Sequence, residues 1–201
     1  APPLYRHQRE CVEAIRHAFR RHRRVLYTQP TGTGKTRTAA EIIALYREKN
    51  PDSRVAVLAP RRELLRQAEG ALKARMPDAR PGWEMGVMHA RLAVGQHDIA
   101  LCSTSTLSRS PERARGLRDA GVGLVWYDEA HHSRADGVHE ALRALGVFDP
   151  TGPRLIGCTA TVKRLDQREL VTDEGESVFQ THAYDYPLLE AVREKMIAPL
   201  K

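Results

Sequence analysis

The chain has 201 residues, of which 41% are hydrophobic and 28% charged, and its formal net charge is +7. A domain of this size buries enough surface to fold without disulfides or a structural metal. No run of residues approaches the roughly 18 apolar positions that a membrane-spanning helix needs, which excludes a membrane partner. A basic balance is expected of proteins that meet phosphate backbones, but many basic domains bind no nucleic acid, so charge alone decides nothing.

The cysteines give the next constraint. Cys11, Cys102 and Cys158 are odd in number and far apart, and no CxxC pair exists. This spacing argues against a zinc ribbon and against a disulfide framework. We therefore expect reduced thiols and a cytoplasmic location. The chain starts at Ala1 rather than Met, so we expect that it has been trimmed from a longer protein.

Short apolar runs alternate with helix-patterned stretches along the whole chain. Helices are predicted at residues 8–20, after Thr36 through Tyr46, and at 62–75, 137–145 and 188–196; strands are predicted at 24–27, 54–59, 98–102, 122–127, 154–158 and 176–186. This alternation predicts an α/β fold with a mostly parallel central sheet and helices on both faces. No internal linker is visible, so residues 1–201 are expected to form one domain.

The strongest signal is the sequence QPTGTGKT, which lies between a predicted strand and a predicted helix. That context is the one a phosphate-binding loop requires. Glycines let successive N–H groups face phosphate oxygens, and the helix N-terminus adds its positive dipole end. We predict that ATP binds here, with Lys35 against the β- and γ-phosphates and Thr36 offering its hydroxyl to Mg²⁺. The predicted nucleotide-binding residues of the loop are Pro30, Thr31, Gly32, Thr33, Gly34, Lys35 and Thr36. The plainer alternative is a glycine-rich turn.

An acidic pair, Asp128 and Glu129, ends the apolar strand 122–127. A P-loop protein holds its metal at the tip of such a strand, so Asp128 is predicted to bind Mg²⁺. Glu129 would then accept a proton from the water that attacks the γ-phosphate. Lys35, Asp128 and Glu129 are thus the predicted catalytic residues. His131 and His132 follow after Ala130, but adjacent positions suit zinc poorly and no third cluster supports a zinc site.

Together these motifs resemble superfamily 2 helicases of the DEAD/DEAH type. QPTGTGKT and DEAHH are similar to their motifs I and II, Thr159-Ala160-Thr161 to motif III, residues 59–65 to motif Ia, and residues 104–107 to the segment called Ib. Leu4 and Gln8 resemble the glutamine motif. The motifs occur in the family's order across nearly the whole chain, and DEAHH with the arginine-rich motif Ia looks most like the group that holds XPB-like repair helicases and restriction-enzyme motor subunits.

This resemblance implies the first, ATP-binding RecA-like domain of a DNA helicase or translocase. It implies adenine recognition by Gln8 and coupling of the ATP state to strand movement by His131, Thr159, Ala160 and Thr161. It also implies nucleic-acid contacts by Arg61, Arg62, Thr104 and Thr106. A helicase core needs a second RecA-like domain, which would supply arginine fingers, and residues 187–201 are expected to lead toward it.

Several interpretations stay open from the residues alone. The basic run Arg20 to Arg24 is either a DNA-binding patch or a solvated helix end favoured by the dipole. Thr104 and Thr106 either meet phosphates or cap a helix. The whole chain is either a hydrolysing motor domain acting on DNA, an RNA-acting relative, or a module that binds nucleotide or DNA without turnover.

Overall fold

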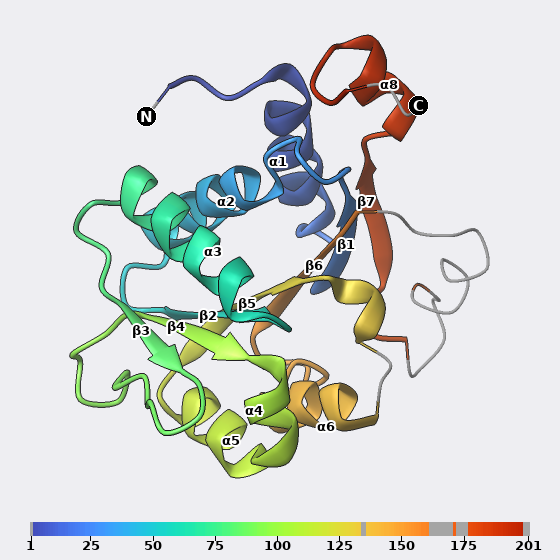
Figure 1. Cartoon of the computed structure of the whole chain (residues 1–201). Coiled ribbons are helices and arrows are strands. Elements are labelled where there is room, and N and C mark those ends of the chain that lie inside the picture. The colour runs from blue at the N-terminus through green and yellow to red at the C-terminus, as the bar shows by residue number, and fades with distance from the viewer. Residues whose placement is uncertain (1, 134–135, 161–170, 172–176, 199–201) are drawn as a thin grey trace.

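The computed structural model describes residues 2–133, 136–160, 171 and 177–198, and it shows a sheet between two layers of helices (Figure 1). The elements in chain order are α1 (Arg6–Ala18), β1 (Arg24–Thr28), α2 (Lys35–Lys49), β2 (Arg54–Ala59), α3 (Arg62–Arg75), β3 (Pro81–Glu84), β4 (Ile99–Ser103), α4 (Thr104–Arg109), α5 (Pro111–Asp119), β5 (Val122–Asp128), a 3₁₀ turn η1 (Ala130–His132), α6 (Asp136–Ala144), β6 (Arg154–Thr159), β7 (Thr181–Asp185) and α8 (Leu188–Arg193).

The sheet has seven strands in the order β3-β4-β2-β5-β6-β1-β7, and every neighbouring pair is parallel. Parallel neighbours need crossover connections, which the helices supply. All strands therefore end at the same edge of the sheet. The connection from β1 to β2 passes over β6 and β5. Open α/β sheets bind ligands outside the carboxyl ends of their strands at such a crossing, which here is the region at the ends of β1 and β5.

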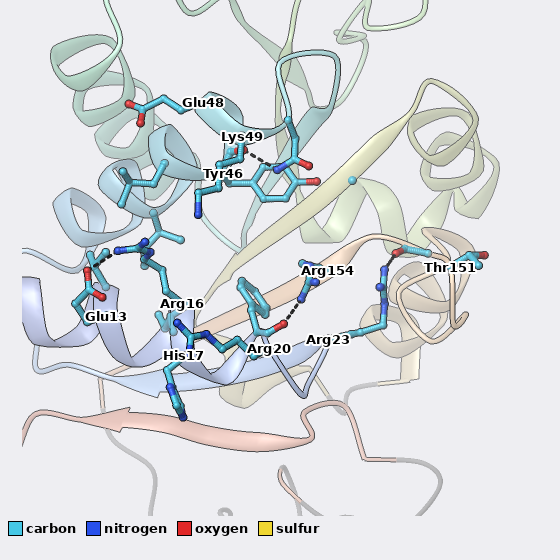
Figure 2. Close-up of a pocket in the computed structure, with 18 residues that line it drawn as sticks. Glu13, Arg16, His17, Arg20, Arg23, Tyr46, Glu48, Lys49, Thr151 and Arg154 are labelled. Atoms are coloured by element: carbon cyan, nitrogen blue, oxygen red, sulfur yellow. Dashed lines mark hydrogen bonds and ion pairs between the residues drawn. The ribbon is translucent and has the colours of Figure 1, made fainter.

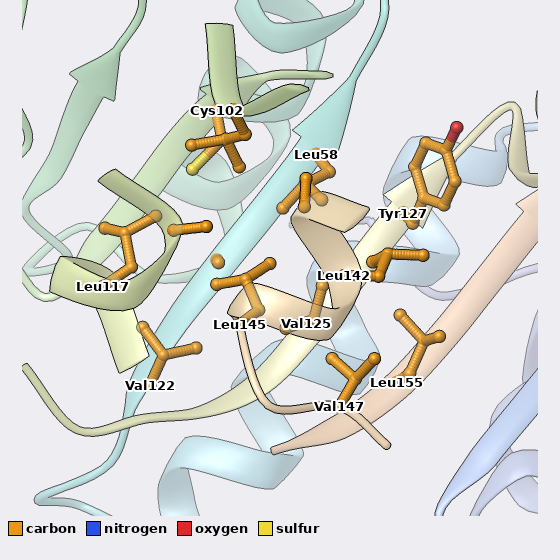
Figure 3. Close-up of a cluster of buried hydrophobic side chains, with 14 of the residues drawn as sticks. Leu58, Cys102, Leu117, Val122, Val125, Tyr127, Leu142, Leu145, Val147 and Leu155 are labelled. Atoms are coloured by element: carbon orange, nitrogen blue, oxygen red, sulfur yellow. The ribbon is translucent and has the colours of Figure 1, made fainter. Parts of the chain in front are cut away.

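Each face of the sheet carries its own hydrophobic core. Val57 and Trp126 pack with α1, α2 and α3, whereas Leu58 and Val125 on the same strands pack with α4, α5 and α6. The second of these cores is shown in Figure 3, with Leu117 and Leu142 facing the strands. Burial of both faces explains why β2 and β5 read as continuous apolar runs rather than alternating ones.

The predicted α/β fold with a parallel sheet is confirmed, but three short elements were not predicted. β3, α4 and α5 have the sequences PGWE, TSTLSR and PERARGLRD, in which too few apolar residues recur to show a period. Pro111 at the start of α5 is the signal that would have found that helix.

The last two predicted elements were too long. The predicted strand 176–186 is wrong in its extent, since β7 covers only Thr181–Asp185. The side-chain Oε1 of Gln180 accepts the backbone N–H groups of Arg23 and Arg24 at 2.8 and 3.0 Å, so strand pairing starts later. Residue 176 lies outside the part of the chain that the structure describes.

The predicted helix 188–196 stops at Arg193. Backbone N–H groups of Lys195 and Met196 bond back to the carbonyls of Val192 and Ala191. This is a Schellman turn, with Lys195 in the left-handed region at φ 58°. The turn has no glycine, and the sequence therefore lacks its usual signal.

Candidate functional site

The predicted motif residues gather at the edge where the parallel strands end. The loop 29–34 follows β1, Asp128 ends β5, and Thr159 ends β6, which lies between those two strands. The backbone N–H of Gln29 bonds the carbonyl of Thr159 at 3.0 Å, so the loop continues directly from the sheet. Three motifs that are far apart in sequence thus share one site.

The loop is held in a curled conformation by its own groups and by α1. The Thr33 hydroxyl donates to the Pro30 carbonyl at 2.7 Å. Gly34 has φ 86°, and a Cβ there would lie 2.5 Å from the Nε2 atom of Gln8, so only glycine fits. Lys35 then begins α2, which has 15 residues and directs its N-terminal N–H groups at the loop.

The acidic pair lies opposite this lysine. Lys35 Nζ is 3.7 Å from Glu129 Oε1, with side chains only 10% and 24% exposed. The backbone N–H of Glu129 donates to Asp128 Oδ1 at 3.0 Å. Burial raises the pKa of the Asp128 carboxyl, and the nearby Lys35 charge opposes that shift. Glu129 itself adopts a left-handed conformation at φ 56°, which is uncommon outside glycine and concentrates at functional sites.

The residues at this edge fit Mg²⁺ better than a transition metal. No group of three or more His, Cys, Asp or Glu side chains capable of holding a metal occurs within the described ranges. Mg²⁺ prefers oxygen ligands and takes one or two from protein together with substrate phosphates. Asp128 and Thr36 offer a carboxylate and a hydroxyl beside the loop, and the Asp128 side chain is almost fully buried.

His131 connects the acidic pair to the end of β6. Its Nδ1 lies 3.1 Å from the Thr159 hydroxyl and 3.4 Å from Glu129 Oε2. Thr159, one of the residues implied to couple the two sites, is therefore in contact with His131. Ala160 follows it at the sheet edge, whereas Thr161 lies among the residues that the structure leaves undescribed.

Gln8 supports the loop from α1. Its Oε1 accepts the backbone N–H of Tyr5 at 3.0 Å, and its Nε2 lies 3.3 Å from the carbonyls of both Thr33 and Gly34. The side chain is fully buried. Its amide thus braces the phosphate loop, a role that sequence reasoning missed. Its contact with adenine stays a prediction.

The predicted nucleic-acid residues lie further along the same edge, after β2 and β4. Arg61 and Arg62 are exposed, and the Arg62 guanidinium lies 5.7 Å from the centre of the Trp83 ring. Thr104 is buried, and the Thr106 hydroxyl accepts the backbone N–H of Gly86 at 3.2 Å. Neither threonine caps α4, because Ser103 holds the N-cap position, so the capping interpretation is wrong.

A cavity of about 810 Å³ lies at the opposite edge of the sheet, between the C-terminal ends of α1 and α2 (Figure 2). None of the motif residues lines it. Arg154 donates to the carbonyls of Phe19 and His22, and Arg23 donates to the Gly152 carbonyl. Within the basic run, Arg23 and Arg24 bond loop carbonyls of the chain itself, whereas Arg20 and Arg21 are exposed, so both interpretations of the run stay open.

Comparison with known proteins places this architecture in a family. The model of the family described as "Type III restriction enzyme, res subunit" matches residues 2–164. The putative ATP-dependent helicase IRC3 of Saccharomyces cerevisiae is 28% identical over all of this chain and 29% of its own length. A Type I restriction enzyme EcoAI endonuclease subunit of Escherichia coli is 27% identical over 96% of this chain and 22% of its own.

Solved structures agree on the fold. The Type ISP restriction-modification enzyme LlaGI, solved with a DNA substrate mimic, has a TM-score of 0.65 at 15% identity and covers 97% of this chain and 21% of its own. The DUF1998 helicase MrfA, solved bound to DNA, has a TM-score of 0.68 at 17% identity over 91% of this chain and 27% of its own.

The chain spans less than a third of the length of the curated relatives it matches. In the part of the chain that the structure describes, no helix is long and apolar enough to cross a membrane. The chain belongs to the Type III restriction enzyme res subunit family and is a helicase-family ATP-binding domain with the RecA-like fold.

Proposed function

We propose that this chain binds Mg²⁺-ATP at the edge where β1, β5 and β6 end, and that it is the hydrolysing half of a motor that moves on DNA. The observation that carries the proposal is the convergence of Lys35 and Glu129, which follow separate strands, β1 and β5, and lie 3.7 Å apart beside the glycine loop. A cation and an acidic pair, of which Asp128 is buried and Glu129 partly buried, beside a helix N-terminus form the arrangement that phosphoryl transfer to water requires.

Each residue then has a defined task. The N–H groups around Gly34 and the Lys35 ammonium bind phosphate oxygens, and in doing so Lys35 leaves Glu129. Glu129 becomes free to orient a water and to accept its proton. Thr36 and Asp128 hold Mg²⁺, which when bound neutralises charge that develops on the phosphates.

The contact of His131 with Glu129 and Thr159 supports a coupling role. His131 touches the predicted base on one side and the end of β6 on the other. A change at the γ-phosphate would therefore reach Thr159 and Ala160, from which the chain continues into Thr161. The DEAH assignment of residues 128–131 rests on their sequence, Asp-Glu-Ala-His, and this network is consistent with it.

DNA as the polymer is supported by the relatives. The EcoAI subunit belongs to a restriction enzyme, and two similar folds were solved with DNA. An RNA-acting relative is the rival, since mouse ATP-dependent RNA helicase DHX58 is 29% identical over 66% of this chain. Because this chain aligns with only 29% and 21% of the length of these two relatives, a second RecA-like domain in the same parent protein is part of the proposal.

The test is ATP turnover by the parent protein, with single-stranded DNA, duplex DNA, RNA or no polymer, beside a Glu129→Gln variant. We expect turnover that rises most with DNA and that falls by at least about a hundredfold in the variant, as loss of a general base does. If only RNA raised turnover, the polymer in this proposal would be RNA rather than DNA.

A second candidate is a nucleotide-binding module without turnover. The Lys35–Glu129 pair favours this second candidate for the 201-residue chain alone, because Glu129, the predicted base, is engaged by Lys35. An arginine finger would also have to come from another domain. ATP binding by the parent protein with no turnover on any polymer would establish this candidate and remove the motor.

A further inference from the structure

An aromatic stack joins the two ends of the described chain. The rings of His7 and Tyr186 are parallel within 1°, with centroids 4.2 Å apart. Tyr5 lies on the same stack, 6.0 Å from His7 at an angle of 8°. His7 and Tyr186 are 1% and 2% exposed, so this contact is buried although Tyr5 is open to solvent.

His7 also touches the phosphate loop. Its Nε2 lies 3.0 Å from the Thr33 carbonyl oxygen, and a carbonyl only accepts, so Nε2 carries the hydrogen. The other ring nitrogen, Nδ1, is buried and has no hydrogen-bond partner within the described structure. One hydrogen bond and the stack on Tyr186 therefore hold the ring in place.

The Thr33 carbonyl matters because its orientation fixes the next N–H group. A trans peptide is planar, so the Thr33 C=O and the Gly34 N–H point in opposite directions. Three donors, from His7, Gln8 and Gln29, converge on this carbonyl at 3.0 to 3.3 Å. Holding the carbonyl against α1 turns the Gly34 N–H away from α1, as a phosphate-binding loop needs.

Tyr186 is the first residue of segment 186–198, which follows β7, and contacts with the rest of that segment hold it in place. Its hydroxyl donates to Glu194 Oε2 at 2.9 Å, and Arg6 on α1 pairs with both Glu190 and Glu194. The same segment returns to the loop, because Ile197 Cγ2 lies 3.3 Å from the position a Cβ on Gly32 would take. Segment 186–198 thus contacts the loop directly through Ile197 and indirectly through the stack.

We propose that His7 and Tyr186 are positioning residues for phosphate binding, and that through them segment 186–198 and the phosphate loop report on one another's position. The inference rests on the proposed function, since it concerns the same phosphate site. A movement of segment 186–198 loosens the ring of His7, which frees the Thr33 peptide to rotate. Conversely, a phosphate seated in the loop acts on segment 186–198 through Ile197, which lies beside Gly32, and through Glu194, which pairs with Arg6.

The test measures affinity of the 201-residue chain for ATP and for inorganic tripolyphosphate, which has no base. Tyr186→Leu removes the stack, His7→Phe keeps the stack but removes the hydrogen bond to Thr33, and Tyr186→Phe keeps the ring. We expect the first two to weaken binding of both ligands by about tenfold and Tyr186→Phe to bind within about twofold of the unchanged chain. Equal weakening of both ligands would place the loss at the phosphate site rather than at a contact with adenine.

Tyr184→Leu is the matched control. Tyr184 lies on β7 and its hydroxyl donates to Glu10 of α1, but it does not stack on His7. We expect a lowered melting temperature with unchanged tripolyphosphate affinity. Should Tyr186→Leu fail to fold, His7→Phe carries the test alone. Normal affinity in His7→Phe or in folded Tyr186→Leu would overturn the inference, whereas an unchanged chain that binds neither ligand would overturn the proposed function itself.

Discussion

Glu129 is the residue at which stability and chemistry conflict. Its left-handed backbone, φ 56° and ψ 46°, turns the chain sharply after β5 and brings the carboxylate to Lys35. For a residue with a Cβ that conformation costs about 1–2 kcal/mol. The strain is tolerated because the turn presents the predicted base to the phosphate loop.

We therefore expect Glu129→Gly to be more stable than Glu129→Ala. Both variants lose the carboxylate and the Lys35 contact, so the comparison isolates the backbone. The relief of strain, less the extra entropy of glycine in the unfolded chain, leaves about 0.5–1 kcal/mol in favour of glycine. Urea unfolding of the two variants measures this difference. An alanine variant at least as stable as the glycine variant would show that residue 129 is not strained.

Asp128 gives a prediction about pH. Burial raises the pKa of its carboxyl, so on acidification it protonates at a higher pH than a free aspartate, whose pKa is about 3.9. Only the ionised form binds Mg²⁺ well. The gain in ATP affinity that Mg²⁺ confers should therefore begin to fall, on acidification, at a higher pH than the pKa of a free aspartate would set.

Asp128→Asn provides the control, because titration of ATP itself affects both proteins alike. The asparagine variant should show little Mg²⁺-dependent gain at any pH. Calorimetric titrations with and without Mg²⁺ give the comparison. A gain in the unchanged chain that falls only near about pH 3.9, the pKa of a free aspartate, would contradict the assignment of Asp128 as the buried ligand.

At the scale of elements, the long buried ones follow from the sequence and the short ones do not. β2 and β5 are buried on both faces, so their apolar runs identified them. The loop after β1 and the acids after β5 were found because their residue types have a recognisable chemistry at the end of a strand. Glycines with a lysine indicate phosphate binding, and paired acids indicate a metal and a base. α4 and β3 were missed, since their burial comes from tertiary neighbours rather than from a local period.

The contacts between elements could not be predicted from local patterns. His7 lies on the buried face of α1, where a histidine has no distinctive signal, and its partner Tyr186 is at the other end of the described chain. Nothing in a single sequence states that these two rings meet. The bracing role of Gln8 was missed for the same reason, although the residue itself was singled out.

The start of α3 yields a prediction about nucleic acid. Arg62 is the first residue of this 14-residue helix and lies over Trp83 of the edge strand β3. A guanidinium at a helix N-terminus is well placed to meet a backbone phosphate. If it does, Arg62→Gln should lower the slope of log affinity against log salt by about one unit on DNA of any sequence.

Lys73→Gln is the matched control, since Lys73 lies on the last turn of the same helix and pairs with Glu69. Its neutralisation should leave the salt slope unchanged. Equal slopes for Arg62→Gln and the unchanged chain, measured by fluorescence anisotropy, would return Arg62 to the solvated surface.

For the whole molecule, the strand order separates two tasks along one edge. The predicted residues for the nucleotide follow β1, β5 and β6, and the predicted residues for nucleic acid follow β2 and β4. The basic cavity at the other edge is lined by none of these residues, and two of its arginines, Arg23 and Arg154, bond carbonyls of the chain itself. A motor needs its two sites joined by rigid elements, and the sheet supplies that connection.

The most direct test of the central claim is Mg²⁺-ATP binding by the 201-residue chain, compared between Lys35→Ala and Lys49→Ala. Both lie on α2, but Lys35 begins it beside the glycine loop and Lys49 ends it beside the basic cavity. We predict that Lys35→Ala weakens binding by about 10- to 100-fold, the value of a charge-assisted phosphate contact, and that Lys49→Ala binds normally. Equal affinities in all three proteins would contradict an ATP site at this edge of the sheet.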